Sequence, residues 1–335
     1  MAGSPPRRPT IASRRIGRGE RAPDFALPFG DGQATTRFYG QAGGRPAVVV
    51  FAGGAGEMAR DLAVALVDEV SPDSCDVFVV TQDAACLDDR SFLDPNHGVH
   101  DAWGIADGDD PTVVVLDPNV RVIVVHESAG PDDVAAVVAA LPDHAIAAPG
   151  GRAPRHAPVL LVPDALDQAL CAQLMATWEQ ADPVATGVET MADGRHVEAL
   201  DDLRKRRRDH VVTEPTLLRT LTAHVGRRVI PELAKAFAFS ATRFEGFKLG
   251  CYTDEDAGFF QAHRDNLSPT TAHRKFALSL NLNDDYEGGE LCFPEYGPAL
   301  YRPDPGEALV FSGGHLHEVR PVTRGRRFVL LSFLF

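Results

Sequence analysis

The stretch His263-Arg264-Asp265, followed at a distance by His317 and Arg327, decides the fold expected for the C-terminal half of this chain. Side chains two positions apart in an extended segment lie on the same face, so His263 and Asp265 can reach one metal ion. His317 follows about 50 residues after Asp265, a separation that allows several strands to bring the chain back to the pair. The sequence therefore predicts a metal site built from two imidazoles and one carboxylate.

The predicted ligand set indicates which metal the site would hold. Two histidines and one carboxylate leave three coordination positions of the metal open, a pattern typical of non-haem Fe(II) centres. A His-x-Asp pair alone is weak evidence, because the chain has 12 histidines and His263 is as readily explained as a surface or core histidine. The surrounding sequence has to decide between these interpretations.

The sequence on both sides of the triad contains short motifs in a characteristic order. A tyrosine-containing segment precedes His263, a strand-like run and two glycine-containing turns follow Asp265, and a basic segment follows His317. The segments are Tyr252–His263, Phe276–Asn283, Gly288–Phe293, Pro305–Phe311, His317–Val322 and Gly325–Arg327. In order, spacing and residue type, residues 244–335 resemble the prolyl 4-hydroxylase-like branch of the 2-oxoglutarate/Fe(II) dioxygenases.

The resemblance implies a role for each matching side chain. His263, Asp265 and His317 match the iron ligands of the family. Arg327 matches the basic residue ten positions after the distal histidine, which in the family pairs with the distal carboxylate of 2-oxoglutarate. A guanidinium suits this role because it donates two parallel hydrogen bonds to one carboxylate.

Two neighbouring residues leave alternatives open. His315 precedes His317 by two positions, but choosing it would shift the His-Glu-Val-x-Pro-Val context, which favours His317. Arg326 adjoins Arg327, and strand alternation sends the two side chains to opposite faces. The match to Gly-x-Arg favours Arg327 as the residue that faces the co-substrate.

Two further residues are expected near the co-substrate. Tyr252 matches a family tyrosine that often contacts it, although a core aromatic explains Tyr252 equally well. Asn281 aligns where some relatives carry a tyrosine close to the co-substrate. The resemblance also implies Fe(II) as the metal, 2-oxoglutarate as the co-substrate and ascorbate as a candidate reductant.

The activity that the resemblance implies is a dioxygen-dependent hydroxylation. 2-Oxoglutarate would be converted to succinate and carbon dioxide while an amino-acid side chain is hydroxylated, as in prolyl 4-hydroxylases. Halogenating relatives lack the carboxylate ligand, so the presence of Asp265 indicates a hydroxylase. The alternative is a non-turnover metal-binding or sensor module of the same barrel, which uses the N-terminal domain as a docking surface. The complete triad together with Arg327 favours the enzyme.

Residues 17–141 alternate between strand and helix patterns. Continuous apolar runs predict strands at 46–51 and 77–80, and residues 111–125 predict two strands around an Asp-Pro-Asn turn. Helical periodicity predicts helices at 56–70 and 131–141. This pattern favours an α/β domain that is separate from the metal-binding half, in a chain of 335 residues that is long enough for two domains.

This N-terminal half resembles the peroxiredoxin/thioredoxin-like superfamily. The matching segments are Gly19–Leu27 at its start and Pro111-Thr112 before the second pair of strands. The family's reactive cysteine belongs just after the first buried strand, at a helix start that lowers its pKa. The corresponding stretch, Phe51–Met58, contains no cysteine, and Cys75 and Cys86 lie elsewhere. We therefore expect a thioredoxin-like domain without peroxidase activity, with a structural or docking role.

Composition marks the remaining segments. Residues 1–16 are rich in arginine and proline, which favours a disordered tail over a transit peptide. Residues 142–158 are rich in proline and glycine and form the expected linker. The dioxygenase domain is then expected at 159–335, as a double-stranded β-helix, or jelly roll, with buttressing helices. The sequence predicts a strand at 159–162, a helix at 164–180 capped by Asp164, and a helical region at 214–239.

Charge and cysteine content limit the class of protein. The net charge of −14 argues against broad nucleic-acid binding. No apolar run approaches the roughly 18 residues of a membrane span, and five scattered cysteines suit a cytoplasmic protein. The expected partner is a peptide or small-molecule substrate, and the sequence does not indicate an oligomeric state.

The run Arg204–Arg208 is the one strong basic segment of the C-terminal half. Such a run is most often a solvent-exposed face, and we expect this here. Because it lies between an irregular segment and a helix of the metal-binding domain, a role at the mouth of the site stays open.

Overall fold

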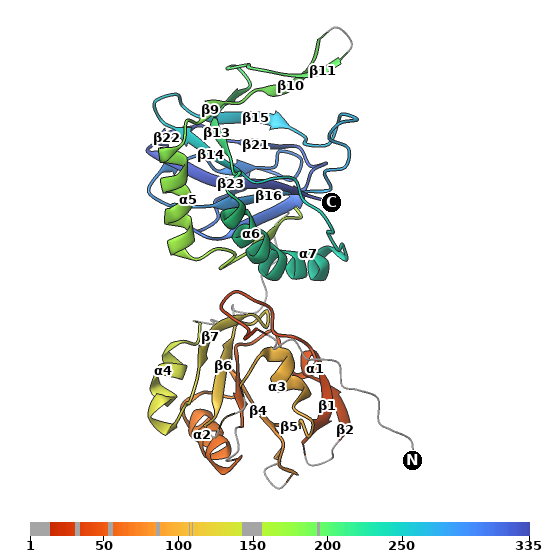
Figure 1. Cartoon of the computed structure of the whole chain (residues 1–335), viewed down its shortest axis with the longest axis vertical. Helices are drawn as coiled ribbons and strands as arrows, with labels where there is room; N and C mark the ends of the chain where they lie inside the picture. The colour runs from red at the N-terminus through yellow and green to blue at the C-terminus, as the bar shows by residue number, and fades with distance from the viewer. Residues whose placement is uncertain are drawn as a thin grey trace. The chain divides into compact units, whose positions relative to one another are not determined.

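The computed structural model describes residues 14–335, except for 31–33, 53–55, 85–87, 107, 109, 143–155 and 193–194. The chain forms two compact units, Met1–Gly151 and Arg152–Phe335, each with hydrophobic cores of its own (Figure 1). Their boundary falls inside the segment 142–158 that the sequence indicates as a linker. Most of that segment, and the basic tail up to residue 13, lie outside the described residues.

The first unit is built on one seven-stranded sheet in the order β2-β1-β5-β4-β3-β6-β7. Strand β3 is parallel to β4 on one side and antiparallel to β6 on the other. The strands are β1 (Ala26–Phe29), β2 (Ala34–Arg37), β3 (Ala47–Phe51), β4 (Asp76–Thr81), β5 (Ser91–Leu93), β6 (Thr112–Leu116) and β7 (Val122–His126).

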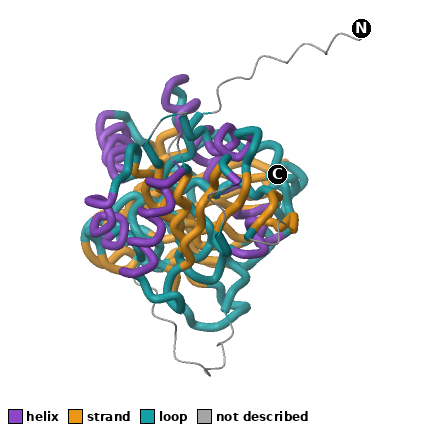
Figure 2. The backbone as a smooth tube through the Cα atoms, turned by 90° about the horizontal axis from the view of Figure 1, so that it is seen from below, coloured by secondary structure: helices purple, strands orange, loops and turns teal. Residues whose placement is uncertain are grey.

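The central strands of this sheet are buried on both faces, which explains their uninterrupted apolar sequence. In β3, Val48 and Val50 belong to one core, and Val49 and Phe51 belong to the other. Helices contribute to each core, so the sheet lies between them (Figures 1 and 2). These helices are α2 (Gly56–Glu69) and α4 (Val134–Ala139) on the first core, and α1 (Phe38–Gln41) and α3 (Gly98–Trp103) on the second.

Sequence periodicity predicts the long elements of this unit well. The strands expected at 46–51, 77–80 and 111–125 and the helix expected at 56–70 are all present at those positions. The helix expected at 131–141 is shorter, because a 3-10 turn, η2 (Pro131–Asp133), precedes α4. The strands β1, β2 and β5 and the helices α1 and α3 were not predicted.

The second unit contains two larger antiparallel sheets, a major and a minor one. Their orders are β8-β20-β16-β23-β14-β13-β9 and β12-β15-β21-β18-β19. The major strands are β8 (Leu160–Val162), β20 (Ala308–Ser312), β16 (Phe276–Asn281), β23 (Arg326–Leu334), β14 (Lys248–Thr253), β13 (Arg208–Val211) and β9 (Val184–Ala185). The minor strands are β12 (Lys205–Arg206), β15 (Phe259–His263), β21 (His317–Val319), β18 (Leu291–Cys292) and β19 (Leu300–Tyr301). Two further pairs are β10 (Val188–Ala192) with β11 (Arg195–Ala199), and β17 (Glu287–Gly288) with β22 (Val322–Arg324).

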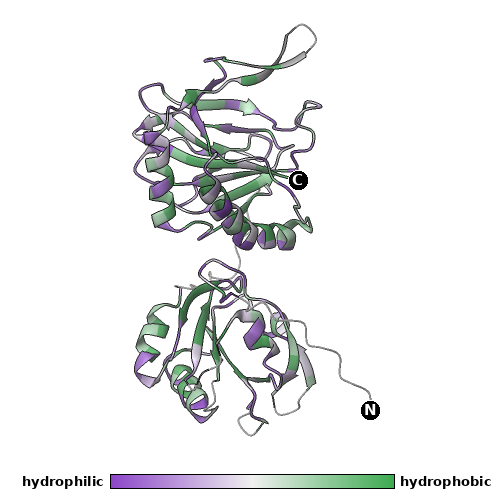
Figure 3. Cartoon of the chain, in the orientation of Figure 1, coloured by the Kyte–Doolittle hydropathy of each residue, from purple (hydrophilic) through white to green (hydrophobic). Residues whose placement is uncertain are grey.

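Three helices pack on the outer face of the major sheet (Figure 1). Leu174 and Leu221 from two of these helices are fully buried in one core with Leu280 and Leu330 of the sheet. Figure 3 shows polar and apolar residues alternating along these helices, as expected for elements with one buried face. The helices are α5 (Gln168–Gln180), α6 (Pro215–His224) and α7 (Ile230–Phe237), with a π-helical turn, η3 (Val225–Val229), between the last two. Among the described residues, no helix has the length and apolar character needed to cross a membrane.

The interior between the two sheets is a separate core. Along β23, Phe328 and Leu330 pack toward the helices, whereas Val329 and Leu331 belong to the inner core. Val319 of the minor sheet joins that inner core. The two sheets therefore enclose a common interior, the arrangement expected for a double-stranded β-helix.

The first helix of this unit begins later than predicted. The side chain of Asp167 accepts a hydrogen bond from the backbone N–H of Leu170 at 2.8 Å and caps α5. The predicted start at Asp164 is wrong, because the backbone of Asp167 is extended, with φ of −82° and ψ of 162°, so no helix runs through it. Before it, the N–H of Leu166 donates to the carbonyl of Gly306 at 3.0 Å and holds the preceding turn against another part of the unit. The second helical region begins as predicted, after the N-cap Glu214.

We expect the N-terminal unit to reduce no hydrogen peroxide with a thiol as electron donor. Its sequence places no cysteine between β3 and α2. Burial, with a smaller contribution from Asp76, raises the pKa of Cys75 to about 11. A thiol that stays protonated at neutral pH is a poor nucleophile. Peroxide consumption by the full chain should equal that of the Cys75→Ser variant. Rapid consumption that either Cys75→Ser or Cys86→Ser abolishes would overturn this expectation.

Candidate active site

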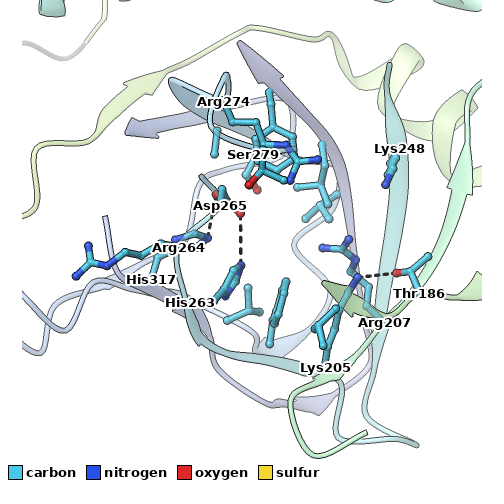
Figure 4. Close-up of a pocket in the computed structure, with 18 of the residues that line it drawn as sticks. Thr186, Lys205, Arg207, Lys248, His263, Arg264, Asp265, Arg274, Ser279 and His317 are labelled. Carbon is cyan, nitrogen blue, oxygen red and sulfur yellow. Dashed lines mark hydrogen bonds and ion pairs between the residues drawn. The ribbon is translucent and has the colours of Figure 1, made fainter. Parts of the chain in front are cut away.

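The three predicted ligands lie together inside the second unit (Figure 4). His263 ends β15 and His317 begins β21, and the two residues are cross-strand partners. Asp265 follows β15, where its backbone N–H donates to the carbonyl of Gly313 at 2.9 Å. One ligand atom from each of the three side chains lies within 4.8 Å of the others. Strand pairing thus brings the distant histidine to the His-x-Asp pair, as the sequence predicts.

Backbone hydrogen bonds orient both imidazoles toward the carboxylate. The Nδ1 atom of His263 is 2.7 Å from the carbonyl oxygen of Gln261, and that of His317 is 3.0 Å from the carbonyl oxygen of His315. A carbonyl only accepts, so Nδ1 of each imidazole is the donor in these contacts, and Nε2 is the nitrogen that can face a metal ion. The two Nε2 atoms each lie 3.5 Å from an oxygen of Asp265. The contacts of the two Nδ1 atoms with backbone carbonyls are the outer hydrogen bonds that metal-ligating histidines usually make.

The protonation states suit a metal ion. Burial lowers the pKa of His317 to about 4, and the nearby Asp265 only partly opposes this. Burial acts to raise the pKa of Asp265, but the two imidazoles and Arg274 together outweigh it and lower that pKa. The neutral imidazole of His317 and the ionised carboxylate of Asp265 are the forms that bind divalent metals. In addition, Oδ2 of Asp265 is buried and accepts no hydrogen bond from the described residues, so the donor set fits a cation.

His315, the alternative to His317, does not belong to the cluster. Its Nδ1 atom lies 3.3 Å from the hydroxyl of Tyr296, and its ring contacts that tyrosine edge-on. Its carbonyl, and not its ring, serves the site by fixing the imidazole of His317. The geometry agrees with the preference for His317 that the sequence context gave.

The triad opens into a pocket of about 840 Å³ that is also lined by Arg327 and Tyr252. Arg327 is only 2 % exposed. Its Nε donates to Oδ1 of Asn281 at 3.4 Å, and its guanidinium lies 5.6 Å from the ring centroid of Tyr252. No described carboxylate forms an ion pair with it. A buried cation without an anionic partner is costly, so this side of the pocket is prepared for an anion.

The neighbouring arginine faces away from the pocket, as strand alternation predicts. Arg326 forms an ion pair with Glu179 of α5 at 2.7 Å, and each side chain is 49 % exposed. Val329 and Leu331 continue the face of Arg327 along the lining of the pocket. Of the two arginines, only Arg327 has access to a ligand bound near the triad.

The two expected co-substrate residues differ in their surroundings. Tyr252 is 2 % exposed and lines the pocket. Asn281 is fully buried, and its Nδ2 donates to the carbonyls of Asn283 at 2.7 Å and Pro303 at 2.9 Å. Its remaining oxygen accepts from Arg327, so the structure places Asn281 behind the arginine and not in the lining. Sequence alignment gave the position of Asn281 but not this supporting contact.

The structure corrects the expectation that the basic run Arg204–Arg208 is a solvent-exposed face. Lys205 and Arg207 are not a solvent-exposed face, because their side chains are 6 % and 10 % exposed and both line the pocket. Arg207 donates to the two oxygens of Asp209 at 2.6 and 2.8 Å. Arg206 and Arg208 point outward and donate to backbone carbonyls. Period-two alternation in an extended segment is the signal that would have separated Lys205 and Arg207 from Arg206 and Arg208. Arg204 precedes β12 and also lines the pocket.

The C-terminal unit is similar in sequence to known proteins. Residues 247–335 match the model of the 2OG-Fe(II) oxygenase superfamily. A PKHD-type hydroxylase of Xanthomonas euvesicatoria pv. vesicatoria is 27% identical over 177 residues, which cover 50% of this chain and 75% of that protein. A PKHD-type hydroxylase of Pseudomonas putida is 32% identical over 121 residues, which cover 32% of this chain and 53% of that protein. The solved structure of a Pseudomonas putida prolyl-4-hydroxylase aligns with a TM-score of 0.41 and 16% identity, over 53% of this chain and 92% of that one.

The C-terminal unit therefore contains a domain of the 2OG-Fe(II) oxygenase superfamily. The chain is a 2-oxoglutarate-dependent Fe(II) hydroxylase, and Fe(II) and 2-oxoglutarate are the cofactor and co-substrate of its family. The matched range begins just before β14 and includes the triad and Arg327.

Removing one ligand should strongly weaken metal binding and leave the fold intact. We expect His263→Ala and Asp265→Ala to weaken Fe(II) binding by more than the roughly 10–100-fold that losing an outer hydrogen-bond partner costs. The matched control is His315→Ala, which removes an imidazole two residues before His317 but no ligand. Anaerobic calorimetric titration of Fe(II) measures the affinity, and circular dichroism checks the fold. Unchanged affinity in either ligand variant would refute the triad.

Proposed function

We propose that this hydroxylase acts on an amino-acid side chain of a peptide, in the manner of prolyl 4-hydroxylases. In this proposal His263, Asp265 and His317 hold Fe(II), and Arg327 holds the distal carboxylate of 2-oxoglutarate. The two relatives described above are PKHD-type hydroxylases, which supports a hydroxylation reaction. The order of motifs from Tyr252 to Arg327 supports the prolyl 4-hydroxylase-like branch.

One observation carries this proposal. Arg327 is a buried guanidinium without a carboxylate partner among the described residues, and it lines the same pocket as the triad. A metal-binding module without turnover would have no use for such a cation, since its burial costs free energy that only an anionic ligand offsets. A dicarboxylate that chelates a metal at one end and meets a guanidinium at the other fits both features.

The chain's own residues prepare the site for oxidation. When bound, Fe(II) and 2-oxoglutarate supply the oxidising chemistry, in which dioxygen is consumed and succinate and carbon dioxide are formed. Phe260 stacks on the ring of His263 with centroids 3.6 Å apart, and Phe311 lies 4.6 Å from the ring of His317. These aromatic rings pack against the imidazoles and hold them in place. Arg327 fixes the far end of the co-substrate by donating two parallel hydrogen bonds.

For the N-terminal unit we propose a thioredoxin-like fold without thiol chemistry. The parallel pair β3 and β4 connected by α2, followed by the antiparallel pair β6 and β7 and by α4, supports that fold. The cysteine-free segment between β3 and α2 supports the loss of thiol chemistry. A structural or docking role remains for this unit.

Arg327 is the test of the proposed function. Removing one member of a buried charged pair costs about 3–5 kcal/mol, which corresponds to a loss of roughly a hundredfold or more in affinity. We therefore expect Arg327→Ala to weaken 2-oxoglutarate binding by that factor while Fe(II) binding survives. Arg327→Lys should recover part of the affinity, because an ammonium keeps the charge but not the two parallel hydrogen bonds. Anaerobic titration of 2-oxoglutarate into the iron-loaded variants measures this.

The matched control is Arg326→Ala, which removes the same side chain from the outer face of β23. It should bind 2-oxoglutarate like the wild type, and succinate release in the presence of peptide substrates should persist. A loss confined to Arg326→Ala would mean that the other arginine holds the co-substrate. Wild-type affinity in all three variants would mean that 2-oxoglutarate is not held here.

A further inference from the structure

The pocket has a charge opposite to that of the chain. The chain carries 47 acidic and 33 basic residues, yet seven arginines and lysines and only two carboxylates line the pocket. The seven are Arg204, Lys205, Arg207, Lys248, Arg264, Arg274 and Arg327. Such a concentration of one sign inside a concave site raises the local concentration of oppositely charged ligands.

Some of these cations are neutralised by neighbouring carboxylates, and others are not. Arg207, Arg264 and Arg274 form ion pairs with Asp209, Glu295 and Glu245, respectively, each at 2.6 Å. Arg204 and Lys248 are exposed and form no ion pair with any described residue. Bound Fe(II) and 2-oxoglutarate carry opposite double charges, so loading the site would leave these two cations without a counter-charge.

The two unpaired cations come from the two different sheets. Lys248 begins β14 of the major sheet and is the cross-strand partner of Leu331 (Figure 4). Arg204 precedes β12, and its carbonyl accepts from the backbone N–H of Gln261, two residues before His263. A chain segment that enters the pocket would therefore meet one cation on each wall.

Exposed apolar side chains lie in the same lining. Leu267 is 76% exposed, and Val197 is 38% exposed. Apolar side chains beside unpaired cations suit a ligand that combines carboxylates with apolar groups. A short acidic peptide has this composition, and it would extend from the triad to both walls.

We infer that the substrate is a peptide segment with an acidic side chain close to the hydroxylated residue, held between Arg204 and Lys248, with an apolar neighbour on Leu267. This inference rests on the proposed function and names its substrate class. The two cations act on substrate recognition and not on the iron or on 2-oxoglutarate.

Direct binding tests the charge preference. The probes are short fluorescent peptides of one length, with a proline-leucine core flanked by glutamate, glutamine or lysine. Fluorescence anisotropy is measured on the full chain, both metal-free and loaded with Mn(II) and 2-oxoglutarate. We expect the glutamate peptide to bind about fivefold tighter than the glutamine peptide, because exposed ion pairs contribute modestly. The preference should shrink at high salt, which screens such pairs.

Charge reversal identifies the residues responsible. Arg204→Glu and Lys248→Glu should each remove the preference for glutamate, while Lys275→Glu, an exposed lysine outside the pocket lining, should leave it unchanged. Equal binding of the three peptides, or a glutamate preference that survives both pocket variants, would refute the inference. Displacement by free glutamate as effectively as by peptide would assign the site to a small acid instead. A failure of the wild type to bind 2-oxoglutarate would refute the proposed function separately.

A second inference comes from the surroundings of Tyr252. The guanidinium carbons of Arg207 and Arg327 each lie 5.6 Å from the centroid of its ring. Nη1 of Arg207 also donates to the hydroxyl oxygen of Tyr252 at 3.1 Å. An arginine can only donate, so the tyrosine oxygen accepts this bond and its own proton is free for another acceptor.

Arg207 is itself held in place. Asp209 accepts two hydrogen bonds from it and outweighs the effect of burial, so the pKa of Arg207 is raised and the side chain stays charged. Gly250 makes room for the pair, because a Cβ there would lie 3.0 Å from Cδ of Arg207 and 3.1 Å from Oδ1 of Asp209. A fixed donor that never loses its proton gives the hydroxyl of Tyr252 one orientation.

We propose that Arg207 is a positioning residue for the co-substrate. It fixes the hydroxyl of Tyr252 as a donor toward the carboxylate that Arg327 holds. The proposal rests on the proposed function, because it requires that an anion binds beside Arg327. It also explains why a cation of the basic run is buried next to a tyrosine.

A double-mutant cycle separates this role from a structural one. Arg207→Met should weaken 2-oxoglutarate binding by roughly tenfold to a hundredfold, as expected for a hydrogen bond to a charged group, and Tyr252→Phe should do the same. Combining the two should cost no more than either alone, because both remove one interaction. Arg208→Met is the matched control, since that arginine faces outward and donates to the carbonyl of Pro183.

Affinities are measured by anaerobic calorimetry on the iron-loaded chain. If Arg207→Met unfolds the domain because Asp209 is left without its partner, the double variant Arg207→Met/Asp209→Asn removes that isolated carboxylate. This double variant then takes the place of Arg207→Met in the cycle. Additive losses, or wild-type affinity in Arg207→Met, would refute the positioning role. Absence of 2-oxoglutarate binding in the wild type would instead refute the proposed function.

Discussion

The burial of opposite charges in one largely apolar interior constrains the rest of the C-terminal unit. Asp265 and Arg327 line the same pocket, and neither forms an ion pair with a described side chain other than the two imidazoles. Leaving such charges without partners costs several kcal/mol per ion. The fold tolerates this because Asn281 and Tyr252 support the guanidinium and His263 and His317 support the carboxylate. A metal ion beside Asp265 and an anionic ligand beside Arg327 would balance these two charges.

Much of the site could be predicted because its residues follow local rules. The pair His263 and Asp265 obeys the alternation of an extended chain, and the separation of Arg326 from Arg327 obeys the same rule. The role of Asn281 could not be predicted, because it depends on carbonyls that the fold brings together. Its amide donates to Pro303, which is 22 residues away in the sequence. No local pattern contains such a contact.

The helices and strands also divide into those that a local sequence pattern predicts and those that depend on the folded chain. Strand β3 and helix α2 were predicted because each has enough residues to show a period. The strands β1 and β5 have four and three residues, too few for a pattern. Asp164 and Asp167 are equally good caps by composition. The extended backbone of Asp167 excludes the earlier start, and only the folded chain shows that conformation.

In the basic run Arg204–Arg208, the direction of each side chain decides which cations can contact a ligand in the pocket. Five adjacent cations suggest a solvated surface, yet their alternation in the folded chain directs Lys205 and Arg207 into the pocket and leaves Arg206 outside. The net charge of −14 repels anions from the molecule as a whole, but salt confines that repulsion to about 10 Å at 0.1 M. The inward cations act at shorter range and in a less polar environment, where each charge counts for more. An acidic protein can therefore select anionic ligands, because recognition depends on the sign of the charge in the pocket and not on that of the whole chain.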